Sequence, residues 1–186
     1  MTQANHGPIQ RLRADIARTY KYTDGSPARR LIWCIRAPGV HAVVVYRFGQ
    51  WLRSLPLIPR LLFEPIYFVG NELVKIMWGI ELPRAAEIGG GLYIGHFGGI
   101  GISSDAIIGE NCTMSPAITI GFRGVGQGTV PVLGDNVYIA SGARIGKVTI
   151  GNNVKIGANT VIDRDIPDDS VVVVDPGFKI VSGPNA

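Results

Sequence analysis

The sequence has few of the residues that build disulfide frameworks or metal centres. It contains two cysteines, Cys34 and Cys112, which stand far apart and form no CxxC pair or Cys/His cluster. The three histidines, His6, His41 and His96, are also widely separated. We therefore predict two reduced, buried thiols, no resident metal ion and a cytoplasmic setting.

The chain also lacks a long uninterrupted hydrophobic run. Residues 1–18 are polar and contain no apolar core of a secretory signal, so no signal peptide is expected. The apolar stretch 55–78 is broken by prolines and charges and falls short of a membrane span of about 20 apolar residues. We expect a buried or interfacial helix there, with peripheral contact at the inner membrane face as one option.

No nucleic-acid-binding motif accompanies the basic character of the chain. The formal charge is +4, and much of the excess falls before residue 61. Such mild basicity fits a polyanionic cofactor or an anionic membrane surface as well as a nucleic acid. Without a motif, no nucleic-acid partner is expected.

What the sequence does have is 25 glycines and, from residue 86 onward, a repeat of six residues. Each repeat begins with an aliphatic residue and has a small or aliphatic residue in its fifth position. Neither a helix nor a plain strand has this period. The repeats begin at Ile88, Ile94, Ile102, Ile108, Met114, Ile120, Leu133, Ile139, Ile150, Ile156 and Ile162.

The fourth position of the repeat carries residue types that tolerate left-handed backbone conformations. Short strands should therefore alternate with tight corners, and stacked coils should bury one continuous core that no single repeat could bury alone. The pattern predicts a mainly β fold, a β-helix. The corner residues are Gly91, Asp105, Asn111, Asn136, Gly142, Asn153 and Asn159.

The period breaks where a functional site is to be sought. The step from Ile94 to Ile102 is eight residues and contains His96, followed by two glycines. The step from Ile120 to Leu133 is thirteen residues, so the segment 122–131 should project as a loop. Residues 163–170 are expected to leave the helix, and 171–181 to add a final strand.

Residues 1–80 have a different pattern and form a helical N-terminal region, whereas 81–186 form the β-helix domain. Helical spacing of apolar residues predicts helices over 11–20, 40–55 and 61–78. Residues 24–27 make a turn or a helix start between the first two. His41, Arg47 and Trp51 lie in the second helix, where we predict packing roles rather than ligand binding.

His96 has the chemistry of a general base. Transfer of an acyl group to a hydroxyl requires a base with a pKa near neutrality to remove the hydroxyl proton, and imidazole meets this need. A nearby carboxylate can hold its tautomer and stabilise the imidazolium. A structural role for a histidine in a bulge is the alternative.

These residues resemble the serine acetyltransferase family. The similarity lies in ELPRAAEIGGGLYIGHFGGIGIS (81–103), in the repeats of 134–167, and in ADI (14–16) and PGVHAVVVYRFGQWL (38–52). It covers nearly the whole chain. The resemblance implies a left-handed parallel β-helix, acetyl-CoA as cosubstrate, a homotrimer with coenzyme A in grooves between neighbours, and no metal.

The resemblance also implies roles for individual residues. His96 matches the general base, and Glu81 takes the place of an aspartate that orients it, although a solvated residue before the first coil is the alternative for Glu81. Asp24 matches an aspartate that contacts the amino-acid substrate, although a helix cap is the alternative. The positions that line the family's coenzyme A groove are Ser141, Lys155, Gly157 and Ala158.

One departure from the family affects the acceptor. Thr129 and Val130 stand before Pro131, where the family has an Arg-His pair that helps to hold the serine carboxylate. Of the remaining cations, Arg123 in the projecting loop could substitute. We therefore expect a sugar hydroxyl as acceptor, as in serine-acetyltransferase-like proteins of exopolysaccharide pathways.

Three other functions are considered. L-serine O-acetylation in cysteine biosynthesis is the first alternative, with a small-molecule rather than a glycan acceptor. A non-catalytic β-helix scaffold is the second, and the His96 bulge argues against it. A β-helical carbonic anhydrase is excluded, because it needs three histidines around one metal ion.

Overall fold

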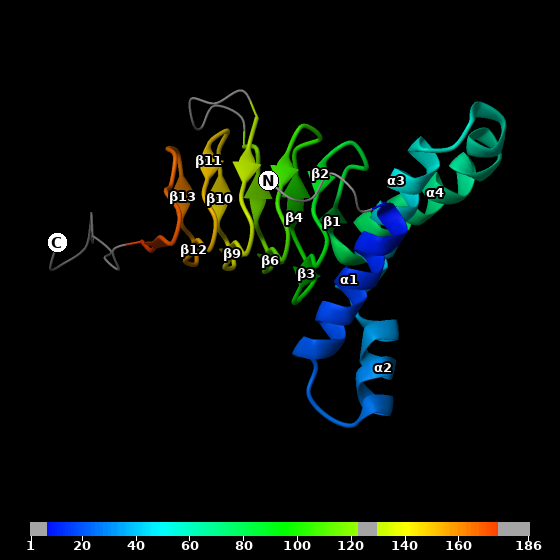
Figure 1. Cartoon of the computed structure of the whole chain (residues 1–186), viewed down its shortest axis with the longest axis horizontal. Helices are drawn as coiled ribbons and strands as arrows, with labels where there is room; N and C mark the ends of the chain where they lie inside the picture. The colour runs from blue at the N-terminus through cyan, green and yellow to red at the C-terminus, as the bar shows by residue number, and fades with distance from the viewer. Residues whose placement is uncertain (1–6, 123–129, 175–186) are drawn as a thin grey trace, which may run out of the picture.

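The structure, a computed structural model, describes residues 7–122 and 130–174. Four helices precede a column of short strands, and the helices cap one end of the column (Figure 1). The predicted helices are present as α1, α3 and α4. A further helix, α2, was not predicted beyond its start. The bounds are α1 Pro8–Tyr22, α2 Pro27–Arg36, α3 Pro38–Arg53 and α4 Leu57–Trp78.

Proline and glycine set the limits of the helices. Prolines occupy the first position of α1, α2 and α3, where a missing backbone N–H costs nothing. At the start of α2 the Ser26 hydroxyl accepts a hydrogen bond from the Arg29 N–H. Helix α4 ends at Gly79, which adopts the left-handed conformation with φ of 60°.

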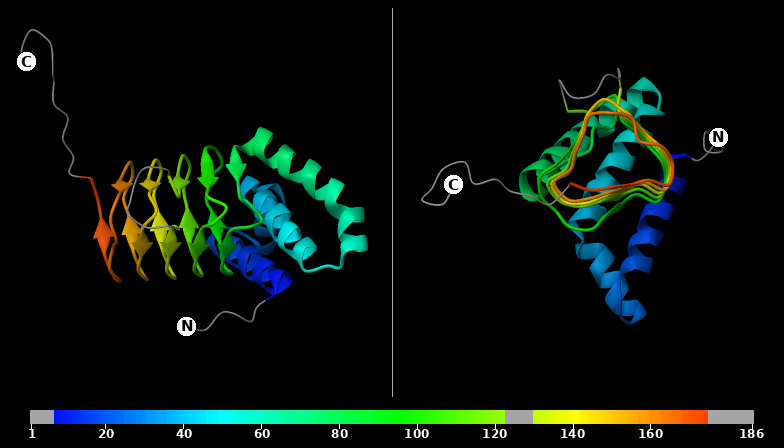
Figure 2. Two further views of the ribbon diagram at one scale, coloured as in Figure 1. Left: turned by 90° about the horizontal axis from the view of Figure 1, so that it is seen from above. Right: turned by 90° about the vertical axis from the view of Figure 1, so that its left-hand side faces the viewer.

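Residues 80–122 and 130–172 form a parallel β-helix with a triangular outline, visible along its axis in Figure 2. Each coil contributes one strand to each of three sheets. The strand orders are β1-β4-β7-β10-β13, β11-β8-β5-β2 and β14-β12-β9-β6-β3. The bounds are β1 Ile80–Glu81, β2 Glu87–Ile88, β3 Tyr93–Ile94, β4 Ile100–Ile102, β5 Ile107–Ile108, β6 Thr113–Met114, β7 Thr119–Ile120, β8 Val132–Leu133, β9 Tyr138–Ile139, β10 Arg144–Ile145, β11 Thr149–Ile150, β12 Lys155–Ile156, β13 Val161–Ile162 and β14 Val171–Val172.

The stacking predicted from the repeat is confirmed. In the first sheet Ile102 pairs with Ile120, which in turn pairs with Ile145. The aliphatic residues that begin the repeats are buried, and so are the fifth-position residues, including Cys112 and Thr160. This core continues into the helical region through Ala42, Val43, Tyr46 and Val74.

The corner residues adopt positive φ as predicted, with one exception. Gly91, Asn111, Asn136, Gly142, Asn153 and Asn159 all have positive φ. The prediction is wrong for Asp105. Its carboxylate accepts hydrogen bonds from the Ser103 hydroxyl and the Lys147 ammonium, and the Ala106 N–H closes the turn onto the Ser103 carbonyl.

The segment 163–170 was predicted to leave the helix, and this is also wrong. Ile166 forms a parallel bridge with Ile150, and its N–H donates to the Thr149 carbonyl. The Asp165 and Asp168 carboxylates accept hydrogen bonds from the backbone of the coil below. The segment therefore completes a coil, in which aspartate side chains replace some of the backbone carbonyls as hydrogen-bond acceptors.

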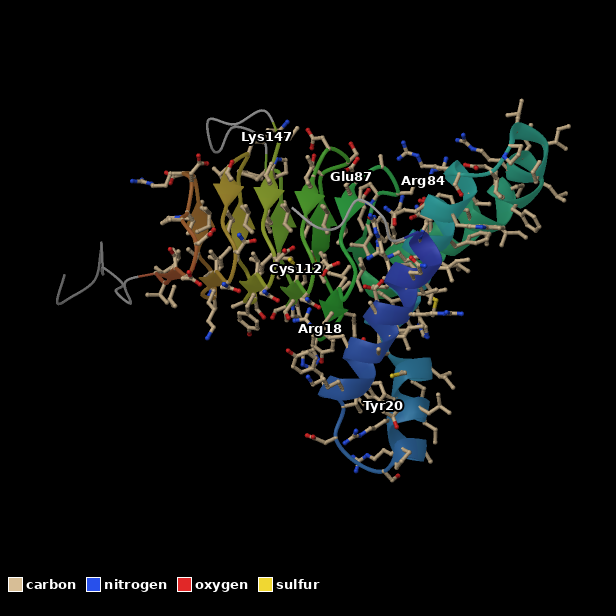
Figure 3. The ribbon with its side chains drawn as sticks, in the orientation of Figure 1. Arg18, Tyr20, Arg84, Glu87, Cys112 and Lys147 are labelled. Carbon is tan, nitrogen blue, oxygen red and sulfur yellow. The ribbon has the colours of Figure 1, made fainter. Side chains whose placement is uncertain are left out.

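Two arginines of the helical cap donate hydrogen bonds to the first coils. Arg47 of α3 is 1% exposed, pairs with Asp15 of α1 at 2.9 Å, and donates to the Ile88 and Gly89 carbonyls. The Asp15 carboxylate also accepts from the Leu92 N–H. Arg47 is thus a core residue, as predicted. Arg18, labelled in Figure 3, donates to the carbonyls of Gly91 and Cys112.

Candidate active site

His96 lies in the corner that joins β3 of the third sheet to β4 of the first. Its side chain is exposed, and the following Gly98 and Gly99 have φ of 111° and 65°. The neighbouring Phe97 ring packs edge-on against Trp78 at 5.5 Å between centroids. Trp78 in turn contacts His41, whose Nε2 lies 2.7 Å from the Ile35 carbonyl. The predicted packing role of His41 is confirmed.

Glu81 lies one coil away from His96. It is exposed at the end of β1, and pairs with Gly101 of β4, shortly after the His96 corner. The corner is joined to the end of α4 by the Ile100 N–H, which donates to the Gly79 carbonyl. In the described ranges no hydrogen bond or ion pair joins Glu81 to His96. The structure places Glu81 on β1 and His96 in the corner before β4, the neighbouring strand of the same sheet, without direct contact.

The predicted coenzyme A positions share an edge of the prism with His96. Ser141 follows β9, and Gly157 and Ala158 follow β12. Both corners, like that of His96, lead from the third sheet to the first. Lys155 is exposed at the start of β12, which leads into the same edge.

Backbone hydrogen bonds connect these corners along the edge. The Ala117 N–H donates to the Gly98 carbonyl, and the Gly142 N–H donates to the Pro116 carbonyl. The Asn159 N–H then donates to the Ser141 carbonyl. The edge is therefore a continuous row of hydrogen-bonded corners with His96 at the end nearest the helices.

The predicted acceptor residues are not brought to this edge within the chain. Asp24 is exposed in the connection between α1 and α2, at the tip of a helical hairpin that points away from the coils (Figure 1). Arg123 and Thr129 lie outside the described residues. Val130 is half-buried at a different edge, between the first and second sheets.

The structure adds a groove that the sequence analysis did not find. Its volume is about 470 Å³, and α2, the residues that follow it and Phe97 line it. The sequence signal was available in Ser26 and Pro27, which start α2, and in the spacing of Arg29, Ile32, Trp33 and Arg36 along one helix face.

The surroundings of two further titratable groups shift their pKa values. Burial raises the pKa of the Cys112 thiol to about 12, so it stays protonated. The Ser103 hydroxyl and then Lys147 lower the pKa of Asp105. Within the described residues no three His, Cys, Asp or Glu side chains gather to hold a metal ion.

Comparison with known proteins agrees with this geometry. The model of the family "Bacterial transferase hexapeptide (six repeats)" matches residues 131–164, which confirms the left-handed parallel β-helix. The chain is 38% identical to a serine acetyltransferase of Synechococcus elongatus over 77% of its own length, and spans 57% of that relative.

Two further matches extend over most of the chain. Serine acetyltransferase isoform 3 of Entamoeba histolytica, solved in complex with cysteine, has a TM-score of 0.73 and 26% identity, covering 96% of this chain and 62% of that one. The serine acetyltransferase of Mycobacterium tuberculosis is 34% identical over 91% of this chain and 72% of its own length. This protein therefore belongs to the serine acetyltransferase family, as its sequence motifs implied.

Proposed function

We propose that the protein transfers the acetyl group of acetyl-CoA to the hydroxyl of L-serine. The relatives named serine acetyltransferase support this acceptor over the sugar hydroxyl that we expected from the sequence. One observation carries the proposal: His96 and the predicted coenzyme A positions lie along one edge of the β-helix.

In the proposed mechanism His96 is the general base. The imidazole removes the hydroxyl proton while the acceptor oxygen attacks the thioester carbonyl, so a C–O bond forms and the C–S bond breaks. The proton then passes to the leaving thiolate. Glu81 stabilises the imidazolium, and backbone N–H groups of the edge stabilise the negative charge on the carbonyl oxygen.

In the same proposal coenzyme A lies along the row of corners. Ser141, Gly157 and Ala158 offer backbone and hydroxyl groups there, and the exposed Lys155 offers a positive charge to a phosphate. The edge leads directly to His96. Such a placement brings the thioester to the base at the end of the row.

A sugar hydroxyl, in polysaccharide biosynthesis, is the second candidate acceptor. Val130 is apolar where the family has part of a cationic pair for the serine carboxylate, and a sugar hydroxyl needs no such pair. Asp24 and Arg123 are the proposed substitutes if serine is the acceptor. Because Asp24 is remote from His96 within the chain, it would have to act in a neighbouring copy.

Release of coenzyme A thiol tests the proposal directly. Purified protein is assayed with acetyl-CoA against L-serine and a panel of sugars, and L-serine should give the higher kcat/KM. His96→Ala should lower turnover about 100-fold or more, while coenzyme A binding stays near normal. Glu81→Gln should lower turnover less than His96→Ala does, because Glu81 orients the base and does not accept the proton. Near-normal turnover of His96→Ala would refute the assignment, and no thiol release with any acceptor would favour the scaffold.

We propose a homotrimer as the working assembly, as the family resemblance implies. Cyclic symmetry would give three equivalent sites, with an edge of the prism from each copy in the grooves between neighbours. Analytical ultracentrifugation at assay concentration should show a single species of about three times 20.0 kDa. An active monomer would contradict this.

We also propose a cytoplasmic protein that contacts the inner membrane face through residues 55–78. Among the described residues no single helix is long and apolar enough to span a membrane, although α2 and α3 together, bent by 64°, satisfy the length and composition. Support for surface contact comes from α4, whose outward residues are apolar. They are Leu57, Ile58, Leu61, Leu62, Ile66, Phe68, Val69, Leu73, Ile76 and Met77.

A further inference from the structure

The groove beside Phe97 is formed by one face of α2. Arg29, Ile32, Trp33 and Arg36 all line it, at positions i, i+3, i+4 and i+7 of the helix. The opposite wall is Phe97, which follows the proposed base directly in the chain. The groove thus combines two cations with an apolar floor.

The two arginines of the groove differ from Arg18, Arg30 and Arg47 of the cap, whose side chains have partners within the chain. Arg47 and Arg18 are engaged by carbonyls or carboxylates, and Arg30 lies over the Tyr20 ring at 5.5 Å. Tyr20 is labelled beside α2 in Figure 3. In contrast, the guanidinium groups of Arg29 and Arg36 have no hydrogen bond or ion pair with any described residue.

The apolar part of the groove is open to solvent, although one side of the Phe97 ring packs against Trp78. Ile32, Trp33 and Phe97 are 56%, 55% and 55% exposed, although each could stack on a flat or aliphatic ligand. Exposed aromatic rings next to unpaired guanidinium groups suit a ligand that has a carbon skeleton and an anionic end.

The groove has an inner and an outer end relative to His96. Ala37 and Pro38, which follow Arg36, also line it, so Arg36 lies at the end of α2. Arg29 lies seven residues earlier, about 10 Å further along the helix axis. A short ligand held near Phe97 would therefore meet Arg36, and a longer one would also reach Arg29.

We propose that Arg36, extended by Arg29, binds the anionic group of the hydroxyl acceptor. The inference rests on the proposed acetyltransferase function and supplies the cationic partner that Val130 does not provide. The anion is the carboxylate of L-serine or the phosphate of a sugar phosphate. The acceptor's carbon skeleton lies against Trp33 and Phe97, which brings its hydroxyl toward His96.

The test is a change in acceptor KM. Arg36→Gln should raise the KM for the acceptor about 10-fold or more, because a hydrogen-bonded charge partner is lost, while the KM for acetyl-CoA is unchanged. The acceptor KM of Arg36→Lys should lie between those of the wild type and Arg36→Gln, since lysine keeps the charge but not the bidentate geometry. Arg30→Gln is the matched control on the same helix, and its acceptor KM should equal that of the wild type.

Two acceptors distinguish the sources of the anion. If the anion is the serine carboxylate, Arg36→Gln should raise the KM for L-serine but leave the KM for L-serinamide unchanged. Arg29→Gln should then have little effect on either KM. If it is a phosphate, glucose 1-phosphate should be the better acceptor, and both variants should weaken it. Unchanged acceptor KM in Arg36→Gln, or a raised KM for acetyl-CoA alone, would overturn the inference.

Direct binding separates this inference from the proposed function. If the wild type released no thiol with any acceptor, the proposed function would fail. Isothermal titration with L-serine and with glucose 1-phosphate would still test the groove. Binding that Arg36→Gln abolishes and Arg30→Gln retains supports the anion site, and no binding to the wild type overturns it.

Discussion

Gly98 sets the course of the chain beyond His96. Its φ of 111° is rarely adopted by residues with a Cβ, although a methyl group there would meet no atom within 4 Å. Gly98→Ala should therefore lower the free energy of unfolding by about 1–2 kcal/mol through backbone strain alone. Gly101→Ala is the matched control, because Gly101 has equally open space and ordinary φ.

Denaturant unfolding of the two variants measures the difference. Gly101→Ala should be as stable as the wild type or slightly more stable, because alanine loses less entropy on folding. Equal destabilisation of both variants would contradict the argument that the positive φ of Gly98 is the cause.

Candidate residues stand out in the sequence where they interrupt a regular pattern. His96 is a candidate because the eight-residue step and two glycines stand out against a period of six. The α2 groove was not found, because its residues form one face only once α2 is known to be a helix. Phe97 meets that face from a distant part of the chain, which no local pattern reveals.

The elements of the cap depend on a buried ion pair. Arg47 and Asp15 are 1% and 2% exposed, and burial raises the pKa of Asp15 despite the hydrogen bond from Arg47. Removing one partner leaves the other buried without compensation. Arg47→Met should therefore lower the free energy of unfolding by about 3–5 kcal/mol.

A double variant shows whether this loss comes from the orphaned carboxylate. Arg47→Met with Asp15→Asn should recover part of the stability, because the amide carries no charge and can still accept from the Leu92 N–H. Thermal unfolding followed by circular dichroism measures both. If the double variant is less stable than Arg47→Met, the carbonyl contacts of Arg47 dominate instead.

At the scale of elements, the repeating coils were predictable and the exceptions were not. The described repeats bury an aliphatic residue at the first position, or Met114 in one repeat, and a small or aliphatic residue at the fifth, so the period alone predicts the strands. The coil formed by 163–170 was not predicted because only Ile166 keeps the repeat pattern there. The Asp165 and Asp168 side chains, instead of backbone carbonyls, accept hydrogen bonds from the neighbouring coil. Helix α2 was not predicted because its apolar residues do not follow one buried face. Four of its large apolar residues are exposed in the structure.

At the scale of the whole molecule, charge divides the chain into two parts. Residues 1–80 have eleven Lys and Arg against four Asp and Glu, whereas residues 81–186 have seven against ten. The helical region is therefore cationic and the β-helix slightly acidic. The same helical region carries the exposed apolar residues of α4, a combination that favours an anionic membrane surface.

The exposed face of α4 gives the test of this membrane contact. Ile58, Leu62 and Ile76 are 83%, 71% and 79% exposed and lie on one side of the helix. The protein should co-sediment with vesicles containing about one third phosphatidylglycerol, more than with pure phosphatidylcholine vesicles, and salt should weaken the binding. Replacing the three residues by serine should reduce the bound fraction several-fold, since each loses buried apolar area.

A control on the other part of the molecule makes this result specific. Val161 and Val171 are 58% and 68% exposed on the β-helix, and their replacement by serine should leave vesicle binding unchanged. If the wild type stays in the supernatant with both kinds of vesicle, the membrane proposal is wrong. If the α4 variant then also sediments as a smaller species than the wild type, the apolar face is covered by another copy of the chain.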